Sequence, residues 1–268
     1  LPYCWNDQTP LSNHELRMDE EVYKNRQDPA VTVGYRLETG ELALIWTTTP
    51  WTLPSNLAMA VRPDIDYVVV ESEGPTGSTE RYLLAEARLT AYTRELGADA
   101  AERVVERLTG ADLIGRSYTP PFSYYAGHPN SHVVLAADYV TTDDGTGIVH
   151  IAPSHGRDDF ELGQANGLPV PDMIDDAGVY LPQVKPFTGR RVYTEAGKPG
   201  DANVAVIKAL IEVGALLAKG TLRHDYPHSW RSKAPLIFRN TPQWFISMAT
   251  NDLRAKALQA IADTDWFP

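Results

Sequence analysis

Alternating and continuous apolar runs predict a chain built mainly from short strands, with helices inserted between them. The strands expected from this pattern are 30–38, 41–48, 57–62, 66–72, 81–84, 132–138 and 147–151. The expected helices are 85–96, ending at Gly97, then 100–108 and 158–166, then 201–218, with Asp201 as N-cap and Gly220 at its end, and a last helix from Asn251 or Asp252 to about Asp263. Residues 74–78 are expected to form a turn. This mixture favours an α+β fold, mostly β, arranged as a closed barrel or a curled sheet.

The segment TTTPWTLPSN, residues 47–56, follows the apolar run 42–46 and interrupts the strand pattern with hydroxyls and two prolines. Proline fixes its own φ and has no N–H, so the chain is expected to leave the sheet here as a stiff loop. A stiff loop lined with Thr and Asn is an uncharged polar surface that suits a small polar substrate and a water. The plainer alternative is a strand end in which Thr is favoured by its β propensity.

A second polar segment, DGTGIVHIAPSHGRDDF, covers residues 144–160. It predicts a glycine turn, a short buried strand, a proline-marked loop and the start of a helix. Asp158 and Asp159 stand where that helix would begin, and acidic side chains are favoured at this end. His150 and Asp159 would flank one cleft if the strand and the helix both open onto it. Taken alone, His150 is more typical of a satisfied core residue, and Asp159 of a stabilised helix start.

The two segments resemble motifs of one protein family, in that family's order. Residues 47–56 resemble the threonine-rich segment of the isoleucyl-tRNA synthetase editing domain, with Thr49 where valyl and leucyl relatives have arginine. The second segment resembles the GTG-hydrophobic-VH-x-AP-x-HG-x-DD motif of the same domains. Shorter matches at 11–15 and 241–245 extend the resemblance over nearly the whole chain. It implies a single editing domain over 1–268, closed and β-barrel-like, with peripheral helices.

The resemblance also implies an activity, which is hydrolysis of the ester of mischarged Val-tRNA(Ile) by a positioned water, without a cofactor. One methylene separates isoleucine from valine by only about 1–3 kcal/mol, and this pair is the standard example of the problem, so a second site is needed. The residues with implied catalytic roles, placing the water and the terminal adenosine, are Thr48, Thr49 and Asn56. Those with implied substrate-binding roles are Thr47, Trp51, Thr52, His150 and Asp159.

Within that set, Asp159 is expected to hold the substrate ammonium, and His150 to form the wall that refuses isoleucine. Trp51 is expected to pack, or to stack on the terminal adenine. His155 is expected to fix the loop before the helix. The family's adenylate-forming motifs, of the His-x-Gly-His and Lys-Met-Ser-Lys-Ser types, do not occur in the sequence. Amino-acid activation is therefore not expected of this chain.

The two ends of the sequence share a frame of Pro, Trp and Pro-Leu at equal offsets, in 2–11 and in 227–236. Cys4, Asp7, Ser229 and Ser232 take the positions of two Cys-x-x-Cys knuckles, and the resemblance implies a split zinc ribbon here. Because Ser is a poor zinc ligand, we expect a degenerate, metal-free ribbon. It should pair 1–20 with 222–245 and connect them to a catalytic domain outside the chain.

Composition adds limits to the partners. The 268 residues are 43% hydrophobic and 22% charged, with one cysteine, as in an ordinary globular protein. No apolar run approaches the ~18 residues of a membrane span, and we expect a cytoplasmic protein without membrane contact. The start at Leu1 suggests a piece of a longer protein.

The net charge of −11 lacks the basic footprint of most nucleic-acid binders. We therefore expect the 3′ end of tRNA to be bound weakly by this chain alone, through a patch at Arg190-Arg191 or at Arg231, Lys233 and Arg239. The rest of a synthetase would be the other partner.

Two rival functions remain open at this point. His150, His155, Asp158 and Asp159 have a spacing that a metal-dependent hydrolase could use, with zinc or a dinuclear centre. A non-catalytic module that binds the 3′ end of an aminoacyl-tRNA is the second rival. Metal content separates the first, and binding without turnover the second.

Overall fold

The structure is a computed structural model that describes residues 1–18, 20–74 and 77–267. Its largest element is a seven-stranded sheet with the order β12-β3-β4-β7-β6-β8, and β9 pairs with β3 outside this path. Two smaller sheets of three strands each, β10-β5-β11 and β13-β1-β2, are also present among the described residues. The strands are β1 (Pro2–Cys4), β2 (Thr9–Pro10), β3 (Tyr23–Leu37), β4 (Leu42–Thr47), β5 (Ala58–Val61), β6 (Asp66–Glu73), β7 (Thr79–Ala85), β8 (Val104–Thr109), β9 (Tyr118–Thr119), β10 (Val133–Ala136), β11 (Val149–Ile151), β12 (Leu216–Pro227) and β13 (Ile237–Phe238).

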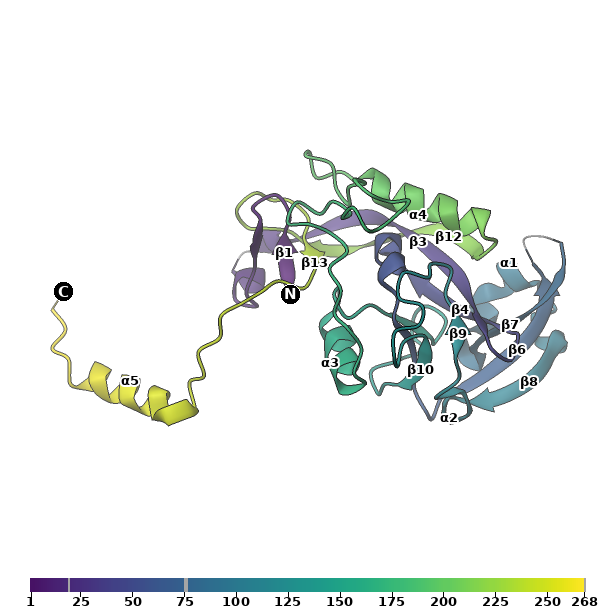
Figure 1. Ribbon diagram of the computed structural model, residues 1–268, viewed down its shortest axis with the longest axis horizontal. Coiled ribbons are helices and arrows are strands. Elements are labelled where there is room, and N and C mark those ends of the chain that lie inside the picture. Colours follow the sequence, from purple (N-terminus) through teal and green to yellow (C-terminus); the bar gives the residue numbers. More distant parts are fainter. Residues whose placement is uncertain (19, 75–76, 268) are drawn as a thin grey trace.

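Short helices surround the sheets. In Figure 1, α4 runs along β3 and β12 at the top of the body, while α3 and α2 lie at its lower side. The α-helices are α1 (Thr93–Leu96), α2 (Gly110–Leu113), α3 (Arg157–Ala165), α4 (Asp201–Glu212) and α5 (Leu253–Ala262). The 3-10 helices are η1 (Glu15–Arg17), η2 (Glu20–Val22), η3 (Pro50–Ser55), η4 (Glu86–Tyr92), η5 (Ala100–Arg103) and η6 (Thr250–Asp252). None of the helices in the described ranges is long and apolar enough to cross a membrane.

Alternation along the central strands divides the apolar core into two clusters. Val68 and Leu84 belong to a smaller cluster that packs under Tyr92 of η4. Val69 belongs to the larger cluster, which it shares with Met59 of the β10-β5-β11 sheet. Neighbouring residues of a strand point to opposite faces, so both faces of the large sheet are covered. The side chains of η3 and β11 belong to the larger cluster, and the segments that the sequence marks as polar therefore rest on it.

Most of the predicted elements are confirmed. β4, β5, β6, β7, β10, β11, α3 and α5 correspond to the predicted strands and helices. The hairpin turns at Gly40, whose φ of +100° suits glycine and whose N–H donates to Leu37 O at 2.9 Å. β3 is longer than predicted and begins at Tyr23. The mostly β architecture with peripheral helices is confirmed as well, although the pairings of the described strands run from β12 to β8 without joining those two edges.

Two helix predictions are wrong in part. Residues 100–108 form only η5 before β8 begins, because β8 pairs antiparallel with β6 and alternates half-buried and exposed side chains. The helix predicted over 201–218 ends as α4 at Glu212, since Gly214 adopts a φ of +69° and β12 then pairs with β3. Gly220 therefore lies within a strand rather than at a helix end.

Two further details differ from the sequence expectation. Asp201 is not the N-cap of α4, which is Gly200, because the Asp201 carboxylate instead binds Arg190 and the N–H of Arg191. The predicted helix 85–96 is divided into η4 and α1, and it ends at Gly97 as expected. Of the predicted turn 74–78, residues 75–76 lie outside the described residues.

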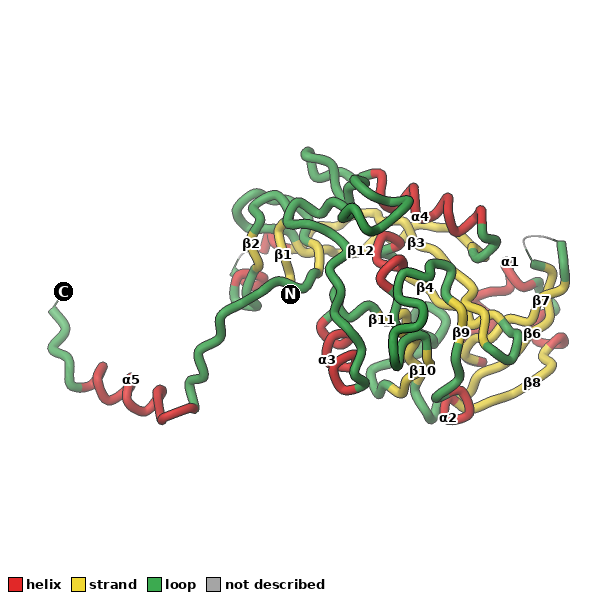
Figure 2. Tube along the Cα trace, in the orientation of Figure 1, coloured by secondary structure: helices red, strands yellow, loops and turns green. Residues whose placement is uncertain are grey.

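The C-terminal residues form an arm that leaves the body. Figures 1 and 2 show residues beyond about 240 extending from β13 and carrying α5 away from the sheets. No residue of α5 is buried. The exposed large apolar side chains of this arm are Trp244, Phe245, Ile246, Met248, Leu253, Leu258, Ile261, Trp266 and Phe267. A fully exposed apolar run of this kind is unusual for a surface that stays in water.

The four knuckle positions meet where the chain ends pair. Asp7 Oδ2 accepts hydrogen bonds from Ser229 Oγ at 2.6 Å and from Ser232 Oγ at 2.9 Å. Cys4 Sγ lies 3.4 Å from Ser232 Oγ and accepts the Asp7 N–H at 3.3 Å. Burial raises the pKa of the Cys4 thiol, so the thiol form is favoured. The cluster is thus a hydrogen-bonded knot around one carboxylate, and its two hydroxyls make it a poor fit to zinc.

Replacing Asp7 by Ala should destabilise this end of the protein. The change leaves the hydroxyl of the fully buried Ser229 without its acceptor, and a hydrogen bond to a charged group is worth about 1.5–3 kcal/mol. We expect a lower free energy of unfolding in urea by roughly that amount. Asp64→Ala is the matched control, because its ion pair with Arg62 is exposed and worth little. Equal losses in the two variants would contradict the prediction.

Candidate functional site

The threonine-rich segment folds as η3 rather than as an irregular loop. Pro50 occupies the first turn, where a missing N–H costs nothing, and all six residues of η3 are buried. Before it, Thr47 Oγ1 accepts the N–H of Thr49 at 3.1 Å and lies 3.1 Å from Thr49 Oγ1. Thr49 Oγ1 lies 3.4 Å from Thr52 Oγ1, which donates to Thr49 O at 2.9 Å. The predicted stiffness therefore comes from hydroxyl-to-backbone bonds as well as from the prolines.

Thr48 stands apart from this ladder of hydroxyls. It is half-buried, and within 1–18, 20–74 and 77–267 its hydroxyl has no hydrogen-bond partner. Its neighbours Thr47 and Thr49 are engaged with each other. Thr48 is therefore the threonine whose donor and acceptor are both available to a bound molecule.

His150 joins the two polar segments. Asn56 Nδ2 donates to His150 Nδ1 at 2.8 Å, and His150 Nε2 lies 3.3 Å from Thr52 Oγ1. The Asn56 amide is oriented by two further bonds, Nδ2 to Ala58 O at 2.9 Å and Tyr118 OH to its Oδ1 at 2.5 Å. Because Asn56 Nδ2 can only donate, His150 Nδ1 accepts and Nε2 carries the proton toward Thr52.

The imidazole is neutral in this setting. Burial lowers the pKa of His150 to about 3, and the nearby His155 lowers it further. Only 9% of His150 is exposed, and only 1% of Asn56. Asn56 is therefore placed behind His150, where it fixes the ring, rather than at a surface that a substrate would touch.

Asp159 enters the site from the first turn of α3. Its Oδ2 accepts the N–H of Ala152 at 2.8 Å, two residues beyond His150. Gly156 makes room for it, because a Cβ there would lie 2.7 Å from Asp159 Oδ1. Burial raises the pKa of Asp159 to about 6, and the charge of the exposed Asp158 adds to this. The group is thus a half-buried carboxylate without a cation partner among the residues that the structure describes.

The start of the second polar segment is hydrogen-bonded to strands β4 and β6 of the large sheet. Thr146 Oγ1 donates to Leu44 O on β4 at 2.5 Å, and Tyr67 OH donates to Gly147 O at 2.7 Å. Gly147 has a φ of +78°, and a Cβ there would lie 2.5 Å from that of Ala85. β11 therefore starts pressed against the large sheet, with its His150 directed at η3.

His155 and Trp51 form the far side of the cluster. Their rings meet edge to face with centroids 4.8 Å apart. His155 Nδ1 donates to Phe238 O at 2.9 Å, and burial lowers its pKa to about 4. The predicted role of His155 in fixing the loop before α3 agrees with this geometry. Trp51 is 5% exposed, which favours the packing role that was one of its two expected roles.

The four residues of the metal-hydrolase alternative do not converge. Both ring nitrogens of His150 are occupied, His155 Nδ1 faces Phe238, and Asp158 is exposed. Among the described residues, no group of three or more His, Cys, Asp and Glu side chains is arranged to hold a metal ion. These four side chains therefore do not form a metal-binding group among the described residues.

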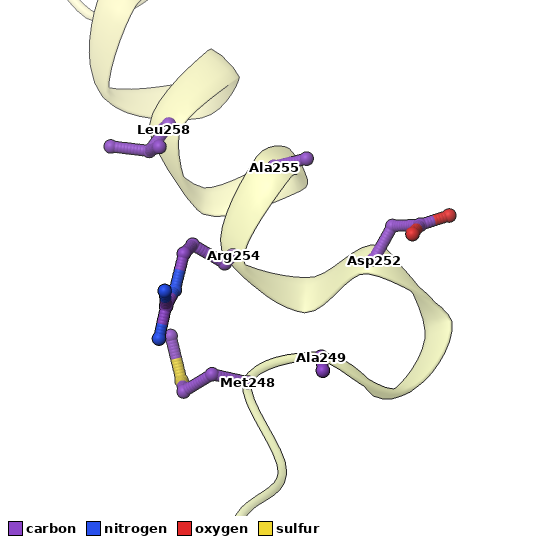
Figure 3. Close-up of a pocket in the computed structure, with 6 residues that line it drawn as sticks. All are labelled: Met248, Ala249, Asp252, Arg254, Ala255 and Leu258. Atoms are coloured by element: carbon purple, nitrogen blue, oxygen red, sulfur yellow. The ribbon is translucent and has the colours of Figure 1, made fainter.

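A separate hollow of about 410 Å³ lies on the C-terminal arm. Figure 3 shows that Met248 and Arg254 lie side by side there, while Asp252 points away. Its lining comes only from residues 248–258, which are remote from η3 and β11 in the sequence and lie on the arm in Figure 1. None of its lining residues belongs to η3, β11 or α3, so this hollow is not part of the candidate site.

Comparisons with known proteins identify the family of the chain and its fold. The sequence profile of the tRNA synthetases class I (I, L, M and V) matches residues 1–268. The chain belongs to this synthetase family. Isoleucine–tRNA ligase of Mycobacterium tuberculosis (strain CDC 1551 / Oshkosh) is 44% identical over 284 residues, covering 100% of this chain and 26% of that protein. The enzyme of the same name from Nocardia farcinica is 47% identical over 278 residues, covering 100% and 25%. The chain thus spans about a quarter of the length of these synthetases.

A solved structure supports the fold. The crystal structure of the P. knowlesi cytosolic leucyl-tRNA synthetase editing domain matches with a TM-score of 0.50 at 12% identity. The match covers 77% of this chain and 99% of that domain. The chain therefore has the fold of an editing domain, as its sequence resemblance implied.

Sequence reasoning missed three side chains that hold the site. Tyr118 binds Asn56, Tyr180 OH donates to Trp51 O, and Asn203 Oδ1 accepts the Trp51 N–H at 3.0 Å. Asn203 left a signal, because it is a polar residue on the apolar face of a predicted helix. The tyrosines left none, since they lie about 60 and 130 residues from their partners in the sequence.

The raised pKa of Asp159 predicts a pH effect on stability. The folded state binds this proton more tightly than the unfolded chain, whose Asp pKa is about 3.9. Stability from this group is therefore present below about pH 4 and is lost as the pH rises through about 6. We would measure urea unfolding of the wild type and of Asp159→Asn between pH 4 and 7. As the pH rises, the free energy of unfolding of the wild type should fall relative to that of the variant. A difference that stays constant across this range would contradict the assignment.

Proposed function

We propose that this chain hydrolyses the ester bond of mischarged Val-tRNA(Ile) within a synthetase that charges tRNA with isoleucine. The proposal rests on the two hydrogen bonds of His150, to Asn56 and to Thr52. They hold the ladder of threonine hydroxyls close to the start of α3, which carries Asp159. Water attacks the ester carbonyl, the bond from that carbon to the ribose oxygen breaks, and the ribose oxygen takes the proton. The products are valine and uncharged tRNA.

Asp159 has the properties of an ammonium clamp. The α-amino group of an aminoacyl ester is a cation, and the half-buried carboxylate has no cation partner among the described residues. Their attraction would offset the burial that raises the pKa of Asp159. A charge-assisted bond of this kind is worth about 1.5–3 kcal/mol.

Thr48 and Thr49 are proposed to place the water and the terminal ribose. Thr48 has the available hydroxyl, and Thr49 lies in the ladder that runs from Thr47 through Thr52 to His150. Asn56 acts one step back, as the residue that fixes the ring of His150. A hydroxyl of the tRNA ribose is the proposed assistant in proton transfer, because His150 is neutral with its only N–H directed at Thr52.

The partners are proposed on the same basis. Several cationic candidates for tRNA contact are already paired, Arg190 with Asp201, Arg231 with Glu15 and Arg239 with Asp176. Binding of the tRNA 3′ end by this chain alone should therefore be weak. The exposed apolar arm is proposed to pack on the remainder of the synthetase, and the ribbon is proposed to work without zinc. A cytoplasmic location would follow from that role.

The proposed function is tested by deacylation of Val-tRNA(Ile), with Ile-tRNA(Ile) as the competing substrate, in the full-length synthetase and in this chain. Valine release with sparing of isoleucine, unchanged by EDTA, is the expected result. Loss of activity with EDTA that returns with zinc would favour the metal hydrolase. Binding of a non-hydrolysable valyl-adenosine analogue without any turnover would favour the binding module.

Thr48→Val should lower the rate constant of deacylation. The substitution keeps the shape and removes only the hydroxyl, so one hydrogen bond to the water or the ribose is lost. We expect a fall of about tenfold or more in kcat, with little change in thermal stability. Thr93→Val is the control, because the exposed hydroxyl of Thr93 donates to Thr90 O in the neighbouring η4. A Thr48→Val rate within about twofold of the wild type would remove Thr48 from the mechanism.

His150→Ala should create a wrong activity. Shrinking the ring opens space for about one methylene, so the variant is expected to release isoleucine from correctly charged Ile-tRNA(Ile). The change in discrimination should be about 1–3 kcal/mol, on the scale of one methylene. Loss of stability alone cannot produce such a gain. If a folded variant, checked by circular dichroism, still spares Ile-tRNA(Ile), then another residue forms the wall.

A further inference from the structure

The threonine helix η3 is held from outside at the backbone of one residue, Trp51. The Trp51 N–H donates to Asn203 Oδ1 at 3.0 Å, and its carbonyl accepts the hydroxyl of Tyr180. Asn203 belongs to α4, and Tyr180 to the long segment without regular structure between α3 and α4 (Figure 2). All three residues are buried, with exposed fractions of 9% or less.

The first turn of η3 needs such a partner. The first N–H groups of a helix have no acceptor within the helix and are normally capped by a side chain of the preceding residue. Thr49 is the N-cap here, yet its side chain makes no capping bond, and Pro50 has no N–H. The Trp51 N–H is therefore the first donor that needs an acceptor, and Asn203 supplies it across about 150 residues of sequence.

Packing alone does not explain why a polar residue stands at position 203. It shares the buried face of α4 with Ala202, Val206, Ile207 and Leu210, where an apolar residue would pack without cost. A buried amide without a partner is unfavourable. Its one side-chain hydrogen bond among the described residues is the one to Trp51.

Two variants of the same shape separate the role of the acceptor from packing. Asn203→Leu fills the same space without an acceptor, and Asn203→Asp keeps an oxygen acceptor. Tyr180→Phe removes the second bond alone. Tyr226→Phe is the matched control, because Tyr226 OH donates to Leu236 O at 2.9 Å in the β12 and β13 region, away from η3.

From this geometry we infer that Asn203 and Tyr180 are positioning residues for the threonine ladder, an inference that rests on the proposed editing function. They touch no reacting atom. By fixing Trp51 they fix the turn that carries Thr48, Thr49 and Thr52, so their loss should reduce turnover and leave substrate binding nearly unchanged.

The first measurement is deacylation of Val-tRNA(Ile) by the full-length synthetase. For Asn203→Leu and Tyr180→Phe we expect kcat to fall about tenfold, the rate equivalent of one hydrogen bond, with KM within about twofold. Asn203→Asp should recover most of the rate, and Tyr226→Phe should match the wild type. If Asn203→Leu does not fold, Tyr180→Phe and Asn203→Asp decide.

The second measurement is independent of the proposed function. Hydrogen exchange of the peptide that contains 49–56 should be faster in Asn203→Leu and Tyr180→Phe, and unchanged in Tyr226→Phe. An inactive wild type would end the proposed function and leave exchange to decide the inference. An active wild type whose kcat and exchange are both unaffected by Asn203→Leu and Tyr180→Phe would overturn the inference alone. Equal losses in Asn203→Leu and Asn203→Asp would overturn the acceptor role.

Discussion

The site depends on one neutral imidazole that is bonded on both sides. His150 accepts from Asn56 and donates toward Thr52, so a single ring joins the end of β11 to the turn that follows β4. Burial keeps this ring neutral, and neutrality is what allows one nitrogen to accept while the other donates. A charged imidazole would present two donors, and the Asn56 amide would then face a donor with its own. The burial of His150 lowers its pKa, and the two hydrogen bonds of the ring in turn require that low pKa.

Around this ring the polar groups are hydrogen-bonded by residues that lie far away in the sequence. Asn56 is oriented by Tyr118, and Trp51 by Asn203 and Tyr180, each of which comes from a different part of the chain. Such bonds cannot form until the tertiary structure has formed, so the geometry of the threonines belongs to the whole fold. Among the described residues, the hydroxyl of Thr48 has no hydrogen-bond partner, and the half-buried carboxylate of Asp159 has no cation partner.

The sequence predicted what depends on local pattern. Alternation identified β4 to β7, and the prolines and hydroxyls of 47–56 marked the turn on which the site is built. Residues 104–108 were predicted as the second half of a helix because their local spacing allows it, yet pairing with β6 makes them a strand. The helix after Asp201 was extended too far because Gly214 was passed over in favour of Gly220. The hydrogen bonds of the Asn56 amide to His150 and Tyr118 could not be predicted from the sequence, because the three residues lie far apart in it.

The close approach of the two ends of the body has a mechanical consequence. The amino group of Leu1 donates to Arg239 O at 3.1 Å, and β1 pairs directly with β13. Because Leu1 and Arg239 lie at the same end of this antiparallel pair, a force that pulls these two residues apart would open the β1–β13 hydrogen bonds one after another before it reached the large sheet. The paired strands would therefore yield first, while the geometry around His150 is preserved.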